Sequence, residues 1–263
     1  MLRPANGYID ELPLLYDHVR LYEVRRDIQF YLEEAKKCGG SVLEVGCGTG
    51  RILLPIARAG IRIDGLDSSP AMLERCKERL SAERRETADL VHLHNGSASS
   101  FDLGKKFQLV TAPFRVAQHL IRIDEQLAFL TSAARHLERG GKLIFDVFNP
   151  NFAALLGADG VEREDTPPTR LPDGRVFRRT ARVKRVRRVD QVSEVEITYY
   201  IVKEGGEDAR LFVHSFDMRW YMRAELIHLV ERGGFGVSAI YGDFDRSPLT
   251  DDSPDIIIVA ERD

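Results

Sequence analysis

The 263-residue chain has few cysteines, no long apolar run and almost no excess of charge of either sign. Its three cysteines, Cys38, Cys47 and Cys76, are odd in number and lack the short spacings of metal sites, which favours reduced thiols in a reducing compartment. No segment approaches the roughly 18 apolar residues of a membrane-spanning helix, and residues 1–10 hold no apolar signal core. These absences predict a cytoplasmic protein that neither binds a metal nor enters a membrane.

The overall composition bounds the fold and the partners. The net charge of −3 gives the whole chain no general attraction to nucleic acid or to an anionic membrane. Hydrophobic residues make up 43% and charged residues 30%, the usual balance of a globular protein. A chain of this length can bury one large core, or form one domain that carries an insertion.

Through the first 150 residues, apolar runs typical of buried strands alternate with amphipathic stretches typical of helices. The expected strands are 41–46, 61–66, 90–95, 107–112 and 142–148, and the expected helices are 19–37, 51–59, 69–81 and 124–138. This alternation predicts parallel strands with helices on both faces. Ser69 and Pro70 suit the cap and first position of a helix, Pro55 requires a helix that starts late or kinks, and Gly140 with Gly141 is expected to end another.

The pattern changes after Pro150. Residues 151–174 are rich in glycine and proline, which predicts a loop or a mobile flap. Alternating residues then predict three antiparallel strands at 176–188, 192–203 and 209–218, with a hairpin turn at 204–207.

The C-terminal residues are expected to form a helix at 223–232 and two strands at 235–241 and 255–260. Only the segment 242–254 joins these two strands, and it is too short for the usual helical crossover. The final strand is therefore predicted to run antiparallel to its neighbours.

Residues 42 to 50 read Val-Leu-Glu-Val-Gly-Cys-Gly-Thr-Gly, so a buried strand leads into three glycines at alternate positions. A strand that turns through glycines into a helix lets the backbone approach a nucleotide-like ligand closely. Dinucleotide-binding folds place the third glycine five residues after the first, whereas Gly50 follows Gly46 by four. The shorter turn suits a cofactor without a pyrophosphate.

Asp67 ends the second expected strand, about 20 residues past the first glycine. A carboxylate at this place can accept hydrogen bonds from both ribose hydroxyls of a nucleotide-like ligand. The alternative is that Asp67 only caps the helix that follows.

The glycine run, with Glu44 two residues before its first glycine, resembles the E/D-x-G-x-G-x-G signature of S-adenosylmethionine-dependent methyltransferases with the Rossmann-like fold. Later segments resemble further motifs of this family in the same order, at 65–73, 95–103, 107–120 and 137–150. Three positions depart from the family pattern. Ser97 and Gln108 each replace a common aspartate, and Arg139 replaces a usual proline.

The resemblance implies an α/β fold. It has a seven-stranded, mostly parallel, doubly wound sheet with an antiparallel last strand, and an inserted antiparallel β-sheet. The expected methyltransferase domain comprises 1–150 and 219–263, and the insertion 151–218 would cap the substrate site. The C-terminal segment, which includes 211–226, is similar to small-molecule methyltransferases such as those acting on glycine and amino sugars.

S-adenosylmethionine is the cofactor that the resemblance implies, and most of its expected contacts lie in the motifs above. The expected cofactor-binding residues are Tyr16, Arg26, Glu44, Gly46, Cys47, Gly48, Asp67, Ser68, Met72, Ser97, Ala98 and Pro113. Related enzymes pair an arginine at the place of Arg26 with the cofactor carboxylate, a geometry that suits a guanidinium. Arg26 is preferred to Arg25 for this role, and the alternative is a solvated helical face. Among the others, Met72 would pack on adenine, and the backbone of Ala98 would be available to the same ring.

Substrate contacts are expected from Phe114, Arg219 and Tyr221. His119 lies just past the fourth strand, at the sheet edge where open α/β sheets bind ligands, and could orient or deprotonate an amine or a hydroxyl. The alternative is a histidine that packs against a helix or the cofactor. A base is needed only if the nucleophile arrives protonated, because positioning alone can supply much of the catalysis.

Residues 175–188 hold eight arginines or lysines among fourteen positions. Three interpretations remain open: a solvated sheet whose charges pair across strands, a site for an acidic small molecule, or a nucleic-acid surface. The favoured function is methyl transfer to a nitrogen or oxygen of a small molecule, by a monomer or homodimer. The alternatives are a nucleic-acid methyltransferase and a cofactor-binding homologue without catalysis.

Overall fold

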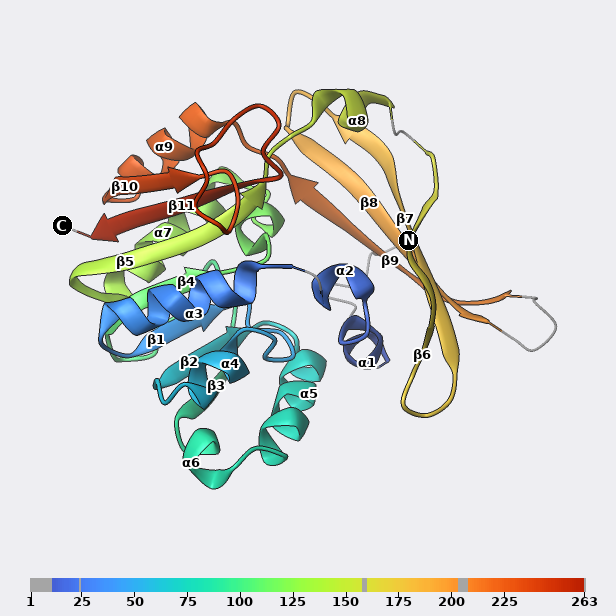
Figure 1. Ribbon diagram of the computed structural model, residues 1–263. Coiled ribbons are helices and arrows are strands. Elements are labelled where there is room, and N and C mark those ends of the chain that lie inside the picture. Colours follow the sequence, from blue (N-terminus) through green and yellow to red (C-terminus); the bar gives the residue numbers. More distant parts are fainter. Residues whose placement is uncertain (1–10, 24, 158–159, 203–207, 263) are drawn as a thin grey trace. The chain divides into compact units, whose positions relative to one another are not determined.

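The computed structural model describes residues 11–23, 25–157, 160–202 and 208–262, which form two compact units (Figure 1). The parallel-sheet unit contains Arg26–Asn149 and the described residues from Trp220 onward. The antiparallel-sheet unit contains the described residues before Arg26 together with Pro150–Arg219. The N-terminal segment, expected with the methyltransferase domain, is thus grouped by compactness with the insertion, and each unit is described by itself.

The parallel-sheet unit is built on seven strands in the order β10-β11-β5-β4-β1-β2-β3. The strands are β1 (Val42–Val45), β2 (Ile63–Asp67), β3 (Val91–Asn95), β4 (Phe107–Ala112), β5 (Leu137–Phe148), β10 (Phe235–Tyr241) and β11 (Asp255–Arg262). Strands β1 to β5 pair in parallel, whereas β11 runs antiparallel to both β5 and β10. The predicted seven-stranded sheet with an antiparallel last strand is confirmed. The strand order reverses between β4 and β1, which is where such sheets bind ligands.

Helices follow the strands of this unit in the predicted alternation. They are α3 (Asp27–Cys38), α4 (Leu53–Arg58), α5 (Pro70–Ser81), α6 (Arg85–Ala88), the 3₁₀ helix η1 (Val116–His119), α7 (Ile123–His136) and α9 (Arg223–Arg232). The Ser69 side chain accepts from the Met72 backbone and caps α5, with Pro70 as its first residue. Pro55 fits α4 because that helix begins only at Leu53, so no helical bond is lost there.

Two expected helix boundaries were wrong. The helix expected at 19–37 is interrupted and becomes the short α2 (Arg20–Glu23) and α3. The glycine pair does not end α7, which stops at His136 where the backbone turns extended. Gly140 instead lies inside β5 with φ of 70°, between the pairs Phe107–Leu137 and Leu109–Lys142 where the register shifts. Glycine is needed there because the bulge requires a left-handed residue.

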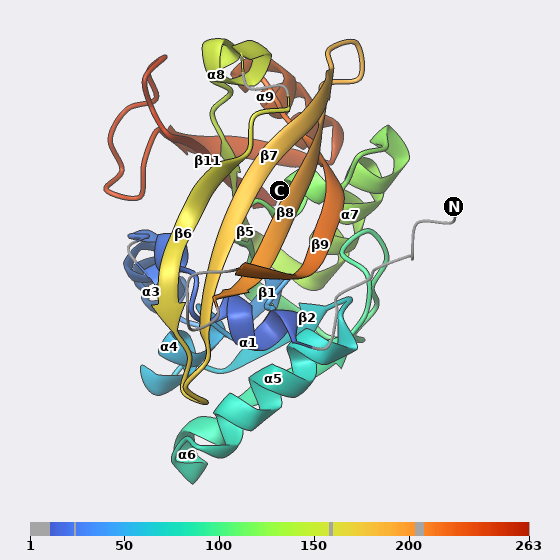
Figure 2. The same cartoon turned by 90° about the vertical axis from the view of Figure 1, so that its right-hand side faces the viewer.

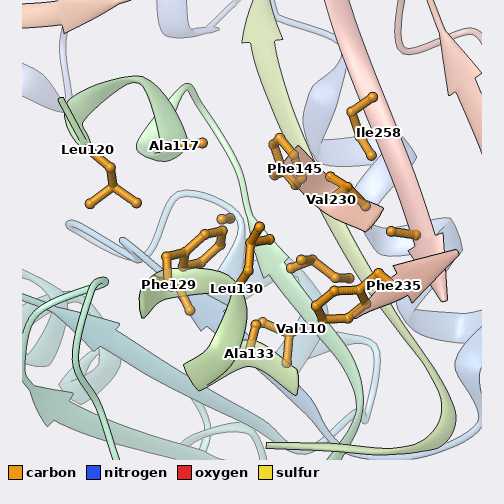
Figure 3. Packing of buried hydrophobic residues seen from close by; sticks show 14 of the residues in the cluster. Val110, Ala117, Leu120, Phe129, Leu130, Ala133, Phe145, Val230, Phe235 and Ile258 are labelled. Atoms are coloured by element: carbon orange, nitrogen blue, oxygen red, sulfur yellow. The ribbon is translucent and has the colours of Figure 1, made fainter. Parts of the chain in front are cut away.

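Both faces of the seven-stranded sheet are buried, each by its own hydrophobic cluster. One cluster joins the strands to α7 and α9 and is seen in Figure 3; the other joins them to α3 and α4. Strand β11 shows why, because Ile256 and Ile258 belong to the first cluster and Ile257 and Val259 to the second. Each such side chain contributes roughly 1.5–3 kcal/mol on burial, which fixes the sheet as a rigid base.

The antiparallel-sheet unit holds a four-stranded sheet in the order β6-β7-β8-β9 (Figure 2). Its elements are α1 (Leu12–Tyr16), α2, α8 (Phe152–Gly157), β6 (Arg163–Arg170), β7 (Val176–Arg187), β8 (Val192–Val202) and β9 (Asp208–Arg219). The three predicted antiparallel strands are confirmed, while the predicted turn at 204–207 lies outside the described residues.

The loop expected at 151–174 was wrong, because this segment forms α8 and β6. Pro167 and Pro168 lie within β6, which is an edge strand of its sheet. A proline on an edge strand costs no ladder bond on the open side, and the register with β7 is irregular between Thr166 and Thr169.

In the described part of the chain no helix is long and apolar enough to cross a membrane. The three cysteines all lie in this part, and no disulfide joins them.

Candidate functional site

The glycine loop joins β1 to α4 and is shaped by its close neighbours. Gly46 has φ of 74°, and a Cβ atom there would lie 2.3 Å from Cγ2 of Val116. Gly48 has φ of 54°, yet a Cβ atom there would meet no described atom within 4 Å. The first glycine is therefore required by packing, while the second leaves its backbone open for a ligand to approach.

Asp67, at the end of β2, ties this loop to the start of α5. Its Oδ2 accepts from the Gly48 backbone N–H and its Oδ1 from that of Ser69, both at 2.8 Å. Burial raises the pKa of Asp67 and outweighs these backbone hydrogen bonds, which lower it. The side chain that caps α5 is Ser69, so capping does not account for Asp67. Each carboxylate oxygen can accept a second bond, and the ribose role stays a prediction.

Glu44 is buried beside the glycine loop, with only 3% of its surface exposed. Its Oε2 has no hydrogen-bond partner among the described residues. Burial raises the pKa of this carboxyl well above the usual range, although Arg51 opposes the shift. An acceptor left in this state is costly unless a donor reaches it, so the position fits a bound group that carries hydrogen-bond donors.

An ion pair that the sequence analysis missed lies next to this loop. Arg51 donates from Nη1 and Nη2 to the two oxygens of Asp27, at 2.8 and 2.6 Å. The Asp27 side chain is fully buried, and the Arg51 guanidinium lies 5.0 Å from the centre of the Phe114 ring. The pair joins α3, the glycine loop and the segment after β4.

The segment after β4, residues 113–119, is fixed by buried side chains. Pro113 is buried, and the half-buried Phe114 that follows donates its backbone N–H to Asp146 Oδ1 at 2.8 Å. Gln118 is also buried and accepts from the Phe148 backbone at 2.9 Å. His119 ends η1 with an exposed side chain. The predicted substrate and catalytic residues of this segment thus lie on one braced loop.

The other expected cofactor residues of this unit differ in exposure. Met72 and Cys47 are buried, and burial raises the pKa of the Cys47 thiol well above its ordinary value. Ala98 is half-buried, whereas Ser97 is exposed and bonds its hydroxyl to that of Ser99 at 2.9 Å. Exposed side chains also occur at Ser68 and Arg26. Their cofactor roles stay predictions.

Tyr221, an expected substrate residue, is buried next to η1. Its side chain is 1% exposed within the core, and its hydroxyl donates to the Ala117 carbonyl at 3.1 Å. The aromatic ring supplies burial, and the hydroxyl finds a backbone partner, as buried tyrosines require. The Tyr221 hydroxyl therefore contacts the backbone of η1, and its role toward substrate stays a prediction.

Two expected site residues belong to the antiparallel-sheet unit. Tyr16 ends α1, and the centre of its ring lies 4.6 Å from the centre of the Tyr22 ring. Arg219 donates to the Asp190 carbonyl at 3.1 Å and to Gln191 Oε1 at 3.3 Å, so it braces the turn between β7 and β8. Their roles toward cofactor and substrate stay predictions.

The basic strand β7 is largely paired with acidic neighbours. Arg182 and Lys184 contact Glu196 across the sheet at 2.5 and 3.3 Å, and Arg187 contacts Asp217 at 3.0 Å. The hydrogen bond from Arg182 lowers the pKa of Glu196. Cross-strand pairing of this kind favours the solvated-sheet interpretation over a nucleic-acid surface.

Comparison with known proteins adds to this geometry. Residues 43–143 match a family described as a methyltransferase domain. The chain is 27% identical over 228 residues to a cypemycin N-terminal methyltransferase of Streptomyces sp, covering 85% of this chain and 84% of that protein. It is 29% identical over 205 residues to the dTDP-3-amino-3,4,6-trideoxy-alpha-D-glucopyranose N,N-dimethyltransferase of Streptomyces venezuelae, covering 77% and 78% of the two chains.

Solved structures show the same fold. An S-adenosylmethionine-bound amino pentose methyltransferase from Micromonospora echinaspora, involved in calicheamicin biosynthesis, matches with a TM-score of 0.69 at 22% identity. The match covers 99% of this chain and all of that one, so it includes the antiparallel sheet as well as the parallel one.

Proposed function

We propose that this chain, which belongs to the S-adenosylmethionine-dependent methyltransferases with a Rossmann-like fold, transfers a methyl group to an amino nitrogen of a small molecule. The observation that carries the proposal is the constellation at the strand ends of β1 and β2. Three features come together there: the open backbone of Gly48, the Asp67 carboxylate that accepts two backbone hydrogen bonds, and the oxygen of Glu44 that lacks a partner among the described residues. The choice of nitrogen over oxygen rests on the Streptomyces venezuelae relative named above, which is an N,N-dimethyltransferase by name.

The residues present fit the cofactor that the family uses. Asp67 would accept from the ribose hydroxyls with its remaining acceptor capacity, and Glu44 Oε2 would gain the donor that it lacks. Met72 and Ala98 would border the adenine, and Arg26 would face the carboxylate. When bound, S-adenosylmethionine supplies an electrophilic methyl group.

The protein's own contribution is placement and control of one proton. An amine attacks only in its neutral form, so a protonated acceptor must first lose a proton. His119 is exposed on the braced loop and would take that proton on a neutral imidazole nitrogen. Phe114 would align the acceptor, and holding the two reacting atoms at near-attack distance can supply roughly 7–11 kcal/mol.

The antiparallel-sheet unit would select the acceptor. Its sheet is stabilised by its own ion pairs, and it carries Arg219, which is assigned to the substrate. Replacing 151–218 by a short linker should then spare binding of S-adenosylhomocysteine and abolish transfer. Retained transfer to the same acceptor would contradict this role. Cytoplasmic location and a monomeric or homodimeric state belong to the same proposal.

The test of the reaction pairs calorimetry with a labelled-methyl assay on a panel of small amines and their hydroxyl analogues. The protein should bind S-adenosylmethionine or S-adenosylhomocysteine but not NAD, and label should appear in amines and not in matched N-acetylated compounds. Label in the hydroxyl analogues alone would replace nitrogen by oxygen as the acceptor. Cofactor binding without transfer to any member of the panel would favour the non-catalytic alternative, and preferential NAD binding would contradict the cofactor.

A further inference from the structure

The segment after β4 contains two successive residues in a conformation that side chains disfavour. Phe114 has φ of 57° and Arg115 has φ of 68°, and neither is glycine. A Cβ atom crowds the backbone in the left-handed region, so such residues persist only where the surrounding structure holds them. Two in a row, in the loop that carries the proposed substrate and proton-transfer residues, call for a specific restraint.

Asp146 supplies that restraint. It lies in β5, where its neighbour Phe145 pairs with Ala112 at the end of β4, and its side chain is 0% exposed. One oxygen, Oδ1, accepts both the Phe114 backbone N–H at 2.8 Å and the Tyr31 hydroxyl at 2.7 Å. Buried hydrogen bonds to a carboxylate are among the stronger ones in proteins, so the first left-handed residue is fixed at its amide.

Helix α3, which carries Tyr31, also contributes to a second restraint on Phe114, which acts on its ring. Asp27 and Tyr31 lie four residues apart on α3, so they share one face of the helix. Asp27 binds Arg51, whose guanidinium lies over the Phe114 ring, while Tyr31 binds the carboxylate that holds the Phe114 amide. One turn of α3 is therefore linked to the amide of Phe114 through Asp146 and to its ring through Arg51.

We propose that Asp146 and Tyr31 are positioning residues for methyl transfer, which hold Phe114 and Arg115 in the left-handed conformation that presents Phe114 and His119 to the acceptor. The inference rests on the proposed function for its catalytic consequence. Both side chains are fully buried, so they would act on the reaction through the loop. The competing explanation is that they are ordinary core partners whose loss lowers stability alone.

Two variants test the restraint directly. Asp146→Ala removes both bonds, and Tyr31→Phe removes only the hydroxyl and leaves the bond to Phe114. A loosened loop misplaces the reacting groups, so kcat should fall about 10- to 100-fold in Asp146→Ala and about three- to tenfold in Tyr31→Phe. The KM for S-adenosylmethionine should change less than kcat in both. Ser238→Ala is the matched control, because it removes one side-chain hydrogen bond, to the Val259 carbonyl at 3.1 Å, elsewhere in the same unit.

A double variant separates positioning from stability. Glycine adopts the left-handed conformation without strain, so Arg115→Gly should reduce the dependence of the loop on Asp146. In the Arg115→Gly background, Asp146→Ala should lower kcat by a smaller factor than in the native background. Equal factors in both backgrounds would overturn the proposal. If Asp146→Ala does not fold, the same comparison is made with Tyr31→Phe.

Hydrogen exchange provides a readout that needs no activity. The Phe114 amide should exchange at least about tenfold faster in Asp146→Ala than in the native chain, because its buried acceptor is gone, and Ser238→Ala should leave it unchanged. An unchanged exchange rate of the Phe114 amide in Asp146→Ala would overturn the restraint, whatever the variant does to methyl transfer. The two claims can also separate the other way. If the Phe114 amide exchanges faster in Asp146→Ala but the native chain methylates no acceptor, the restraint stands and the proposed function is refuted.

Discussion

The two sheets of this protein use charged side chains in different ways. In the parallel-sheet unit, Asp67 and Asp146 accept hydrogen bonds from backbone amides of neighbouring loops. In the antiparallel-sheet unit, Arg179 and Arg182 pair with carboxylates of adjacent strands. The first arrangement shapes loops at the strand ends and leaves acceptor capacity for a ligand. The second satisfies the sheet internally, so its strands are held together without a ligand.

Arg179 is the clearest example of internal pairing. Only 2% of the residue is exposed, and its Nε and Nη2 donate to the two Asp165 oxygens at 2.8 and 2.9 Å. Its Nη1 donates to the Tyr22 hydroxyl at 2.8 Å, which ties α2 to the sheet. Although burial lowers the pKa of Arg179, Tyr22 and Asp165 raise it by more, so the guanidinium stays charged.

The largest effect should come from breaking this pair. Arg179→Leu leaves Asp165 without its partner, which should lower the free energy of unfolding of the antiparallel-sheet unit by about 3 kcal/mol. A denaturant titration that is monitored by hydrogen exchange of the β7 amides measures this loss of stability. The double variant Arg179→Leu/Asp165→Leu should recover much of the loss, because no unpaired charge remains. A single variant as stable as the native chain would show that the pair does not stabilise the sheet.

A smaller effect, on binding instead of folding, is expected from Asp67→Ala. Loss of hydrogen bonds to a charged group should weaken binding of S-adenosylhomocysteine by roughly 1–3 kcal/mol while the fold survives. Titration calorimetry measures it, with Asp102→Ala as the matched control because that carboxylate is exposed in the same unit. Unchanged affinity in the folded variant would reduce Asp67 to a brace of the glycine loop.

A still smaller loss of free energy is expected from Ser69→Ala. Its hydroxyl caps α5 by accepting from the Met72 amide at 3.3 Å, and losing such a cap costs about 1 kcal/mol of stability. The thermal unfolding midpoint should fall accordingly. In Ser81→Ala, where the hydroxyl donates to the Glu78 carbonyl on the exposed end of the same helix, the midpoint should hardly move. Equal shifts in the two variants would argue against the cap.

The smallest effect should come from the charge pairs of β7. Glu196→Gln should lower stability by only about 0.2–1 kcal/mol, because partly exposed ion pairs are weak. Arg182 lowers the pKa of Glu196 in the folded state, so its contribution is present above the ordinary glutamate pKa and is lost as the pH falls through the lowered one. The native chain and the variant should therefore converge in acid and in high salt. A difference that persists at low pH would exclude the ion pair as its cause.

Local features of this molecule can be predicted from its sequence, whereas long-range contacts cannot. The glycine loop, the place of Asp67 at the end of a strand and the positions of most strands follow from local patterns, since periodicity and glycine spacing are read within a few residues. The roles of Asp146 and Tyr31 do not, because these partners are 115 residues apart and meet only in the folded sheet. Arg51 and Asp27 escaped for the same reason, at a separation of 24 residues.

Two further features depend on tertiary context. Local patterns do not predict strand β6, because Pro167 and Pro168 normally break strands and only an edge position makes them tolerable. Tyr221 has a packing role that no local pattern predicts, because its ring belongs to the core and its hydroxyl donates to the Ala117 carbonyl.

The chain passes between the two units at three places: from Arg25 to Arg26, from Asn149 to Pro150 and from Arg219 to Trp220. The antiparallel-sheet unit is therefore discontinuous in sequence, and recombination cannot exchange it as a single segment. A chimera that imports only a relative's 150–219 would set foreign strands against the native α2 and would need its own counterpart of the hydrogen bond between Tyr22 and Arg179. Exchange of acceptor preference between such enzymes should thus require the N-terminal helices and the inserted strands to travel together.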